Sequence, residues 1–384
     1  MKIVSWQSVL TDHQSHTIRE LQKVVQEPVL IVSGVKELAA RQRQGWSAPD
    51  VSDLQVRYLP SNGWWKMGIS IFTEHKNATH MFNTMWGDRR FYPLLIAAKW
   101  YGVKTVLMTE PYSEVGVGYL DEDSTWGVKL KAFLRPWLYR YVGGHVAKNF
   151  SAIFAISNKA AEQFERIGVD KEKIFPFGYF VPPLPRPKLP IRNRDDALNL
   201  IFVGSLIKRK GIDSLIEAIK ICEIKGFNVV LDVYGPGKFD KLKCINNVQH
   251  RGVIPFGHAQ EVISNYDVLV LPSLYDGWGV VVNEALLQGV PVIVSDQVGA
   301  KCLIEKSGAG EVIKVNDVGA LSNCFQELII NPDRLETWKY AALKFSPCLM
   351  PKNGAQYLYD CLYPSSPLIN ESSNISSFMD SSDS

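Results

Sequence analysis

Residues 268–296 constrain the fold of this 384-residue chain more than any other segment, because they combine a strand, a turn, a helix and a second strand. The apolar run Val268–Leu271 is typical of a strand buried on both faces of a parallel sheet. Helical spacing follows over Val280–Gln288 and ends at a Gly-Val-Pro sequence, after which Val292–Val294 predicts the next strand. This order predicts a parallel α/β fold with the turn Pro272–Gly279 at the carboxyl end of a strand, where such folds bind ligands.

The turn has the residues of an anion-binding site. Gly277 and Gly279 let backbone amides, including that of Val280, approach an anion where free N–H groups and the helix dipole favour negative charge. Asp276 stands before the glycines and Glu284 lies eight residues later in the helix, so the two carboxylates can reach opposite ends of one ligand. We therefore predict a site for a phosphorylated ligand that carries hydroxyl groups. The alternative is an ordinary strand-turn-helix with two solvated acids.

The pattern of Asp276, seven residues and Glu284, after a Pro-Ser dipeptide and before A-L-L-Q-G-V-P-V-I, resembles the signature of retaining glycosyltransferases of family 4. The resemblance implies that Glu284 holds the ribose hydroxyls of a nucleotide and that Asp276 lies near the hydroxyls of the donor sugar. It also implies that the adjacent amides of Gly279 and Val280 hold the diphosphate. The family more often has Glu at the position of Asp276, so the shorter side chain predicts a different contact with the sugar.

A second strand-to-helix loop carries positive charge. The expected strand Leu200–Gly204 leads through this loop into the amphipathic run Ile212–Ile219. The cations Lys208, Arg209 and Lys210 therefore belong at the carboxyl end of the sheet, the edge at which open α/β sheets bind ligands. A solvated basic loop is the alternative.

The family resemblance assigns parts of this loop to the donor site. Lys210 matches the lysine that neutralises the donor diphosphate. Ser205 stands where the family often has an arginine, and Arg209 is the cation that could replace that charge. Gly204 and Ile254 complete the residues that we expect to bind the nucleotide sugar.

The same resemblance implies the GT-B architecture, an α/β fold of two Rossmann-like domains that face a central cleft. Alternating strand and helix patterns in both halves favour parallel sheets, and a proline-rich stretch between them lacks this periodicity. The expected division is 1–175 for an N-terminal acceptor-binding domain, 176–199 for a linker, 200–330 for a nucleotide-sugar-binding domain, 331–364 for helices that cross back to the first domain, and 365–384 for a disordered tail.

In the first half, two helices are expected, at Ser15–Val25 and Phe91–Tyr101. The expected strands are Lys2–Ser5, Val29–Ser33, Gly68–Phe72, Met81–Asn83, Lys104–Met108 and Ala152–Ile156. The dinucleotide fingerprint G-x-G-x-x-G is absent after the first strand, which weakens a dehydrogenase interpretation.

The acceptor half carries fewer motifs. Glu110 follows the strand Lys104–Met108, near the point where many family members have a histidine that contacts the donor sugar. A carboxylate here could orient a sugar hydroxyl or accept its proton, or it could cap a helix or pair with a loop cation. His13, in the first strand-to-helix loop, has two equal interpretations, a structural or solvated residue and a contact to the acceptor.

Charge and composition exclude other classes. A net charge of +3 argues against a dedicated nucleic-acid binder, and no apolar stretch approaches the ~20 residues that span a bilayer. The six cysteines are scattered without a C-x-x-C pair or histidines at metal spacing, as expected of reduced packing residues in a cytosolic protein. The pair Asp195-Asp196 belongs to the linker and is typical of solvated acids, so we expect no metal and no cofactor besides the donor substrate.

Residues 127–150 contain five Lys or Arg, aromatic residues between them and no acid. Such a stretch suits an anionic membrane surface. A helix that covers its own domain and directs its cations outward is the equal alternative. Both interpretations are compatible with a cytoplasmic protein, and the first adds a peripheral position on the inner face of the plasma membrane.

The resemblance implies transfer of a sugar from a nucleotide diphosphate donor to a hydroxyl of a saccharide or lipid-linked saccharide, with Asp276, Glu110 and Lys210 as the catalytic set. The implied setting is bacterial surface polysaccharide assembly, as O-antigen, capsule or exopolysaccharide. Two alternatives stay open, a nucleotide-sugar epimerase of similar shape and a non-catalytic scaffold that kept the fold. The sugar, the base and the acceptor depend on loop shapes that local motifs do not define.

Overall fold

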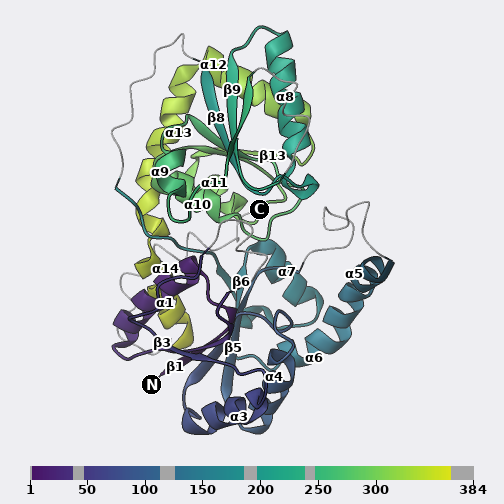
Figure 1. Ribbon diagram of the computed structural model, residues 1–384, viewed down its shortest axis with the longest axis vertical. Helices are drawn as coiled ribbons and strands as arrows, with labels where there is room; N and C mark the ends of the chain where they lie inside the picture. Colours follow the sequence, from purple (N-terminus) through teal and green to yellow (C-terminus); the bar gives the residue numbers. More distant parts are fainter. Residues whose placement is uncertain (1, 38–46, 113–125, 186–196, 238–246, 365–384) are drawn as a thin grey trace.

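The computed structural model describes residues 2–37, 47–112, 126–185, 197–237 and 247–364, which form two α/β domains (Figure 1). Each domain is built on one sheet whose strands are all parallel and are flanked by helices. The predicted α/β class with two Rossmann-like domains is therefore confirmed.

The first sheet has seven strands in the order β3-β2-β1-β4-β5-β6-β7. Its inner strands are almost continuously apolar because helices cover both faces of a parallel sheet, and all five residues of Ala152–Ile156 are buried. The strands are β1 (Ile3–Val9), β2 (Leu30–Val35), β3 (Gln55–Tyr58), β4 (Thr79–Phe82), β5 (Lys104–Thr109), β6 (Ala152–Ile156) and β7 (Ile174–Phe177).

The first helix begins directly after β1, at the carboxyl end of the sheet. There the backbone N–H of Thr11 donates to Oε1 of Gln14 at 3.2 Å, which satisfies a donor at the helix start. The helical elements of this domain are α1 (Asp12–Val25), α3 (Trp64–Glu74), α4 (Phe91–Trp100), α5 (Trp126–Leu138), the π-helical turn η1 (Tyr139–Gly143), α6 (Gly144–Ala147), α7 (Asn158–Arg166) and η2 (Lys171–Lys173).

The second sheet has six strands in the order β10-β9-β8-β11-β12-β13. Its strands are β8 (Leu198–Val203), β9 (Val229–Tyr234), β10 (Val248–Gly252), β11 (Val268–Leu271), β12 (Val292–Ser295) and β13 (Gly310–Ile313). The helical elements are η3 (Lys208–Lys210), α8 (Ile212–Ile224), α9 (Ala259–Ile263), α10 (Val280–Leu287), α11 (Lys301–Ser307), α12 (Val318–Ile330), α13 (Pro332–Phe345), η5 (Ser346–Leu349) and α14 (Pro351–Leu362).

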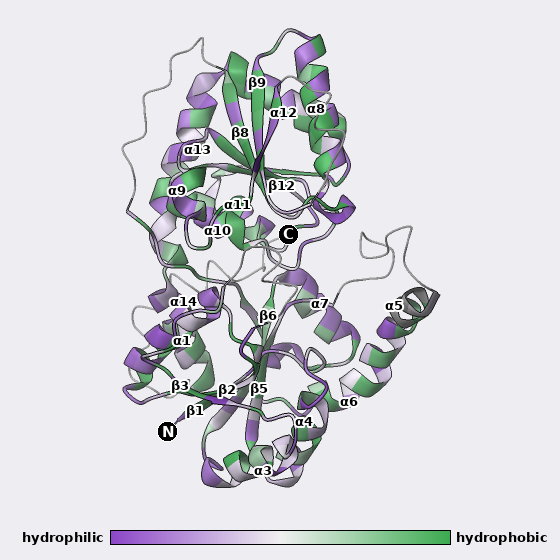
Figure 2. Ribbon diagram, in the orientation of Figure 1, coloured by the Kyte–Doolittle hydropathy of each residue, from purple (hydrophilic) through white to green (hydrophobic). Residues whose placement is uncertain are grey.

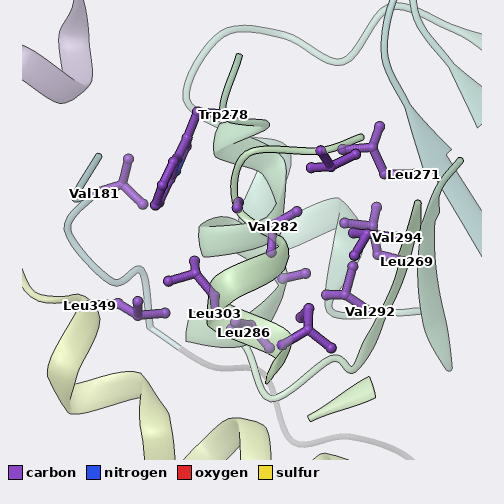
Figure 3. Close-up of a cluster of buried hydrophobic side chains, with 14 of the residues drawn as sticks. Val181, Leu269, Leu271, Trp278, Val282, Leu286, Val292, Val294, Leu303 and Leu349 are labelled. Atoms are coloured by element: carbon purple, nitrogen blue, oxygen red, sulfur yellow. The ribbon is translucent and has the colours of Figure 1, made fainter. Parts of the chain in front are cut away.

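Hydrophobic residues concentrate in the central strands of the second sheet (Figure 2). Helix α10 lies within this core. Its Val282 lies between the ring of Trp278 and Leu269 of β11, and Leu286 lies further along the helix (Figure 3). Val282 and Leu286 are both fully buried. Burial of such side chains stabilises the fold by roughly 1.5–3 kcal/mol each, so the helix that begins the predicted anion site has a rigid base.

The last helix, α14, lies against α1 of the first domain (Figure 1). The hydroxyl of Tyr363 donates to the carbonyl of Lys2 at 3.4 Å, and Nζ of Lys104 donates to the carbonyl of Leu362 at 3.2 Å. The end of the described chain is therefore anchored on the first domain.

Two sequence predictions were wrong. The run Gly68–Phe72 is not a strand but the middle of α3, where Gly68 packs so closely on α4 that a Cβ would lie 2.4 Å from Cδ2 of Leu94. The linker was placed too widely at 176–199, because its first two residues belong to β7 and Leu198 begins β8. Of this linker, residues 186–196 lie outside the described residues, as do Asp195-Asp196 and the predicted tail.

None of the described helices has the length and apolar content that crossing a bilayer requires.

Candidate functional site

A cleft of about 380 Å³ lies between the two domains at the carboxyl ends of their strands. It contains all but one of the predicted site residues, and Gly277 lies beside it. The residues that line it are Asp12, His13, Glu110, Tyr179, Val181, Val203, Gly204, Ser205, Arg209, Lys210, Tyr234, Gly235, Pro236, Val253, Ile254, Pro255, Phe256, Gly257, Ala259, Asp276, Trp278, Gly279, Val280, Val281 and Glu284. A larger depression of about 810 Å³ beside α1 and the start of α14 holds none of the predicted residues.

Lys210 and Asp276 form an ion pair in this cleft. Nζ of Lys210 lies 2.5 Å from Oδ2 of Asp276, and each side chain is about one-sixth exposed or less. The two residues come from the loops after β8 and β11, which are adjacent strands of the sheet. Arg209 also lines the cleft and donates from Nη1 to the carbonyl of Tyr275 at 2.8 Å. The cleft therefore contains two cations at the loop where the sequence predicted positive charge for binding a diphosphate.

The glycine turn that leads into α10 is held close to its surroundings. Gly279 has φ of +93°, a left-handed conformation that glycine adopts without strain, and it caps α10. A Cβ on Gly277 would lie 2.3 Å from Oε2 of Glu110, so the carboxylate of the first domain touches the turn of the second. The turn thus offers free amides at a helix start and accommodates an acid from across the cleft.

Glu284 is partly buried in α10 and faces the first domain. Burial and the negative charge of Asp12 raise the pKa of Glu284 to about 7. Asp12 itself begins α1, and its Oδ2 lies 3.3 Å from Nε2 of His16. Burial works against ionisation of Asp12, but His16, His13 and Arg19 together lower its pKa. The two acids therefore approach each other from opposite domains, and the one in the second domain is the weaker acid.

A chain of hydrogen bonds connects the carboxylate of Glu110, in the first domain, to helix α10. The hydroxyl of Tyr179 donates to Oε1 of Glu110 at 2.7 Å, and Nδ2 of Asn283 donates to the carbonyl of Tyr179 at 2.8 Å. The indole N–H of Trp278 donates to Oδ1 of Asn283 at 2.8 Å. Gly178 allows this arrangement, since a Cβ there would lie 2.5 Å from the Trp278 ring. Tyr179 consequently fixes where the Glu110 carboxylate lies.

Two further contacts define the first-domain wall of the cleft. The hydroxyl of Tyr275 donates across the domains to the carbonyl of Pro111 at 3.0 Å, next to Glu110. The buried ring of His13 packs on the ring of Tyr179 with centroids 4.2 Å apart, and its Nε2 lies 3.0 Å from Oγ1 of Thr11. His13 thus has a structural role and also lines the cleft.

The far end of the cleft is formed by the loops after β8 and β9. A Cβ on Gly235 would lie 1.9 Å from the carbonyl oxygen of Gly204, so these two loops make direct backbone contact. Ser205 and Ile254 are half-buried beside them. This end is apolar and aromatic, with Tyr234 and Phe256 in its wall.

Among the cleft residues that sequence reasoning missed, three take part in the polar contacts described above: Asp12, Tyr179 and Trp278. Asp12 follows the first strand as a helix start, a signal like that used for the second domain, whereas Tyr179 lay in the stretch assigned to the linker. Trp278 stood between two recognised glycines. Among the described residues, no group of three or more His, Cys, Asp or Glu side chains gathers in a way that could hold a metal ion.

Two facing parallel α/β domains with a phosphate-compatible cleft between them define a protein of the GT-B class. Residues 188–345, which include the second sheet, match the model of the family "Glycosyl transferases group 1".

Curated relatives match parts of the chain. A capsular polysaccharide biosynthesis glycosyltransferase of Staphylococcus aureus, CapM, is 32% identical over 143 residues, which are 35% of this chain and 38% of that protein. A putative teichuronic acid biosynthesis glycosyltransferase of Bacillus subtilis, TuaC, is 29% identical over 197 residues, 49% of this chain and 48% of that protein. The matches to these two relatives therefore span less than half of their length.

Solved structures extend the likeness of fold to both domains. The Anabaena protein HepE in complex with UDP-glucose is 15% identical, with a TM-score of 0.66 over 95% of this chain and 100% of that chain. WaaG, a glycosyltransferase involved in lipopolysaccharide biosynthesis, is 15% identical, with a TM-score of 0.60 over 93% of this chain and 98% of that chain. At these identities the likeness defines the fold, and the fold is GT-B.

Proposed function

We propose that the protein transfers a sugar from a nucleoside diphosphate sugar to a hydroxyl of a saccharide or lipid-linked saccharide acceptor, in the assembly of a bacterial surface polysaccharide. The observation that carries the proposal is the composition of the cleft. Cations and a helix start lie beside carboxylates from both domains, so one ligand can be held by its phosphates and by its hydroxyls.

The names of the related proteins support the proposed role in polysaccharide assembly. CapM, TuaC and a putative colanic acid biosynthesis glycosyltransferase of Escherichia coli are all named for surface polymer synthesis. HepE was crystallised with UDP-glucose, and TarM of S. aureus with UDP and a glycosylated glycerol. We extend the donor class, a nucleoside diphosphate sugar, and the acceptor class, a saccharide, to this chain.

In the proposed reaction, the bond between the anomeric carbon and the diphosphate oxygen breaks and a bond to the acceptor oxygen forms. The proton of the acceptor hydroxyl passes to the departing phosphate oxygen. Because the acceptor attacks from the face that the diphosphate leaves, the anomeric carbon keeps its configuration, as in the retaining enzymes of family 4. Lys210, the amides of Gly279 and Val280, and the positive end of α10 stabilise the charge that develops on the diphosphate. Glu284 holds the ribose hydroxyls.

The carboxylates near the reacting sugar have different surroundings. Asp276 is paired with Lys210, so it can accept hydrogen bonds from sugar hydroxyls while it holds the cation in place. Glu110 is largely exposed to the cleft and is held by Tyr179, which suits a residue that orients a hydroxyl of the sugar or the acceptor. We propose that charge neutralisation by Lys210 and the helix start makes a divalent ion unnecessary. Turnover that is lost in chelator and restored by magnesium or manganese would contradict this.

A thermal-shift screen against UDP, GDP and ADP and their sugar derivatives tests the donor site, because a ligand that binds only the folded state raises its stability. We expect one nucleotide to shift the melting temperature, and Glu284→Ala to abolish that shift. Glu305→Ala, an exposed acid on α11, is the control and should leave it unchanged. A shift that persists in Glu284→Ala would remove the proposed ribose contact.

A transfer assay with the nucleotide sugar so identified separates the remaining classes. A transferase releases the nucleoside diphosphate and needs an acceptor. An epimerase would instead produce an altered nucleotide sugar without an acceptor, and a scaffold would bind the nucleotide without turnover.

A lipid-linked acceptor remains in the membrane, so we further propose that the protein acts in the cytoplasm at the inner face of the plasma membrane.

A further inference from the structure

Helix α5 projects from the first domain away from the rest of the molecule (Figure 1). It continues through the π-helical turn η1 into α6, and its main described contacts are with that turn. Pro136 lies inside α5 and cannot donate a backbone hydrogen bond, which explains why regular α-helix gives way to a wider turn only three residues later.

One side of this helix carries large apolar residues that are exposed. They recur every three or four residues, the spacing that places them along one face of a helix and that normally faces a core. We call them the α5 face: Trp126 (76% exposed), Leu130 (37%), Phe133 (64%), Leu134 (43%), Trp137 (57%), Leu138 (51%) and Tyr141 (63%).

The exposure of this face favours the membrane interpretation for the first part of residues 127–150, whereas Val146, Ala147 and Phe150 near its end are buried in the first domain and cover it. A helix that covers its own domain would bury its apolar stripe, whereas here the described apolar side chains face outward. The rings of Trp137 and Tyr141 stack on each other, with centroids 5.6 Å apart and planes 10° apart, and form one broad aromatic surface.

The sequence from Trp126 onward carries charge of a single sign, although Asp121, Glu122 and Asp123 directly precede it. No Asp or Glu occurs between Trp126 and Ala161, and the helix and the turns that follow it contain five Lys or Arg. Among these, Arg140 and Lys148 have exposed side chains. Aromatic residues beside cations, without acids, complement a surface that is apolar below and negatively charged at its head groups.

The base of this projection packs against residues that lie beside Glu110, a residue of the cleft wall. Tyr139, the first residue of η1, stacks on Tyr112 with ring centroids 4.2 Å apart, and Tyr112 is two residues from Glu110. Tyr112 is fixed in turn by Gln163, which accepts from its N–H and donates to its carbonyl, both at 2.9 Å. Packing contacts therefore link a surface bound at α5 to Glu110 on the first-domain side of the cleft.

We propose that the α5 face docks on an anionic lipid bilayer, with its aromatic and aliphatic side chains inserted among the acyl chains and the cations at the head groups. The docking places the first-domain side of the cleft next to the membrane, so a lipid-linked saccharide can reach Glu110 without leaving the bilayer. This second statement rests on the proposed function, whereas the docking itself does not.

Vesicle flotation of the full-length protein tests the proposal, with phosphatidylcholine alone and with added phosphatidylglycerol, at low and high salt. We expect binding to the anionic vesicles, and at least about tenfold weaker binding to neutral vesicles and in high salt. The double variant Phe133→Ser/Trp137→Ser should lower binding to anionic vesicles by at least about tenfold. The matched control is Ile330→Ser/Tyr340→Ser, because these residues of the second domain are 70% and 69% exposed.

The control should bind within about twofold of the parent protein, and all variants should keep the nucleotide-dependent thermal shift. Absence of binding by the parent protein, or equal losses in both double variants, would overturn the proposal. So would size-exclusion data in which Phe133→Ser/Trp137→Ser converts a dimer to a monomer while vesicle binding is absent, since a second copy would then be the occupant. Vesicle binding without any nucleotide shift would instead count against the proposed function and leave the docking surface standing.

Discussion

Nζ of Lys210 lies 2.5 Å from Oδ2 of Asp276, so the cation predicted to bind a diphosphate is held in place by an acid 66 positions further along the chain. The two residues follow adjacent strands, β8 and β11, and the pair joins the two halves of the proposed donor site. A diphosphate that enters the cleft meets a cation whose position is already fixed. Because little side-chain freedom is then lost on binding, the pair preorganises the site.

Replacement of this lysine should reduce turnover strongly. We expect Lys210→Ala to lower kcat/KM by about 10²–10³, because it removes a donor that stabilises charge on the leaving diphosphate. Lys208→Ala is the matched control, since Lys208 is exposed in the same η3 turn, and it should stay within about twofold. Steady-state kinetics of the two variants provide the comparison.

Lys210→Ala also leaves the Asp276 carboxylate without its ion-pair partner, and this uncompensated charge could reduce activity by destabilising the fold. The double variant Lys210→Met/Asp276→Asn separates these effects, because it restores neutrality without a cation. Recovery of kcat/KM to near the parent value would mean that Lys210 serves only to pair with Asp276. The assignments of Lys210 to the diphosphate and of Asp276 to the donor sugar would then both fail.

Tyr179 should act on turnover through Glu110. Tyr179→Phe removes the 2.7 Å hydrogen bond to the Glu110 carboxylate, and we expect kcat to fall about tenfold while nucleotide binding stays nearly constant. Tyr266→Phe is matched, because Tyr266 donates to the Asp232 carboxylate at 2.6 Å and does not line the cleft. It should lower thermal stability without a comparable loss of kcat. A large rise of KM for the nucleotide sugar in Tyr179→Phe would indicate a different role.

Replacement of Gly211, the glycine before α8, should lower the stability of the fold rather than turnover alone. Gly211 has φ of +71°, and a Cβ there would lie 2.0 Å from the carbonyl oxygen of Pro272, a backbone atom that cannot move aside easily. We expect Gly211→Ala to destabilise the protein by more than about 3 kcal/mol. Gly226→Ala shares the left-handed conformation (φ +81°) but meets open space, so it should cost only about 1–2 kcal/mol. Urea unfolding of the full chain measures both, and equal losses would show that the contact with Pro272 is unimportant.

The site in the second domain was easier to predict because most of its residues lie close together in the sequence. Asp276, Gly279 and Glu284 lie on one uninterrupted strand, turn and helix, so hydrophobic pattern and glycine spacing suffice to place them together. The pairing of Lys210 with Asp276 depends instead on which strands are neighbours. A basic loop and an acid far away in the sequence gave no local signal of it.

The first domain was less predictable for two physical reasons. Short apolar runs such as Gly68–Phe72 fit a strand and a buried helix equally well, and only the packing on α4 selects the helix. The proline-rich stretch that begins at Pro176 was assigned to the linker, yet Pro176 lies in β7, the edge strand of its sheet, where proline is tolerated. The contact of Glu110 with Tyr179 and Gly277 depends on how the domains face each other, which no local pattern encodes.

Nucleotide binding should depend on pH through Glu284, whose pKa is raised to about 7 by burial and by Asp12. A raised pKa keeps the acid protonated below about pH 7, and only the ionised carboxylate accepts hydrogen bonds from both ribose hydroxyls. Affinity should therefore rise about tenfold from pH 6 to pH 8, as calorimetric titration with the nucleotide would measure. Asp12→Asn removes the neighbouring negative charge and should move the midpoint to lower pH, whereas Asp53→Asn, at an exposed acid of the same domain, should not. The same pH profile in Glu284→Gln as in the parent protein would assign the titration to another group.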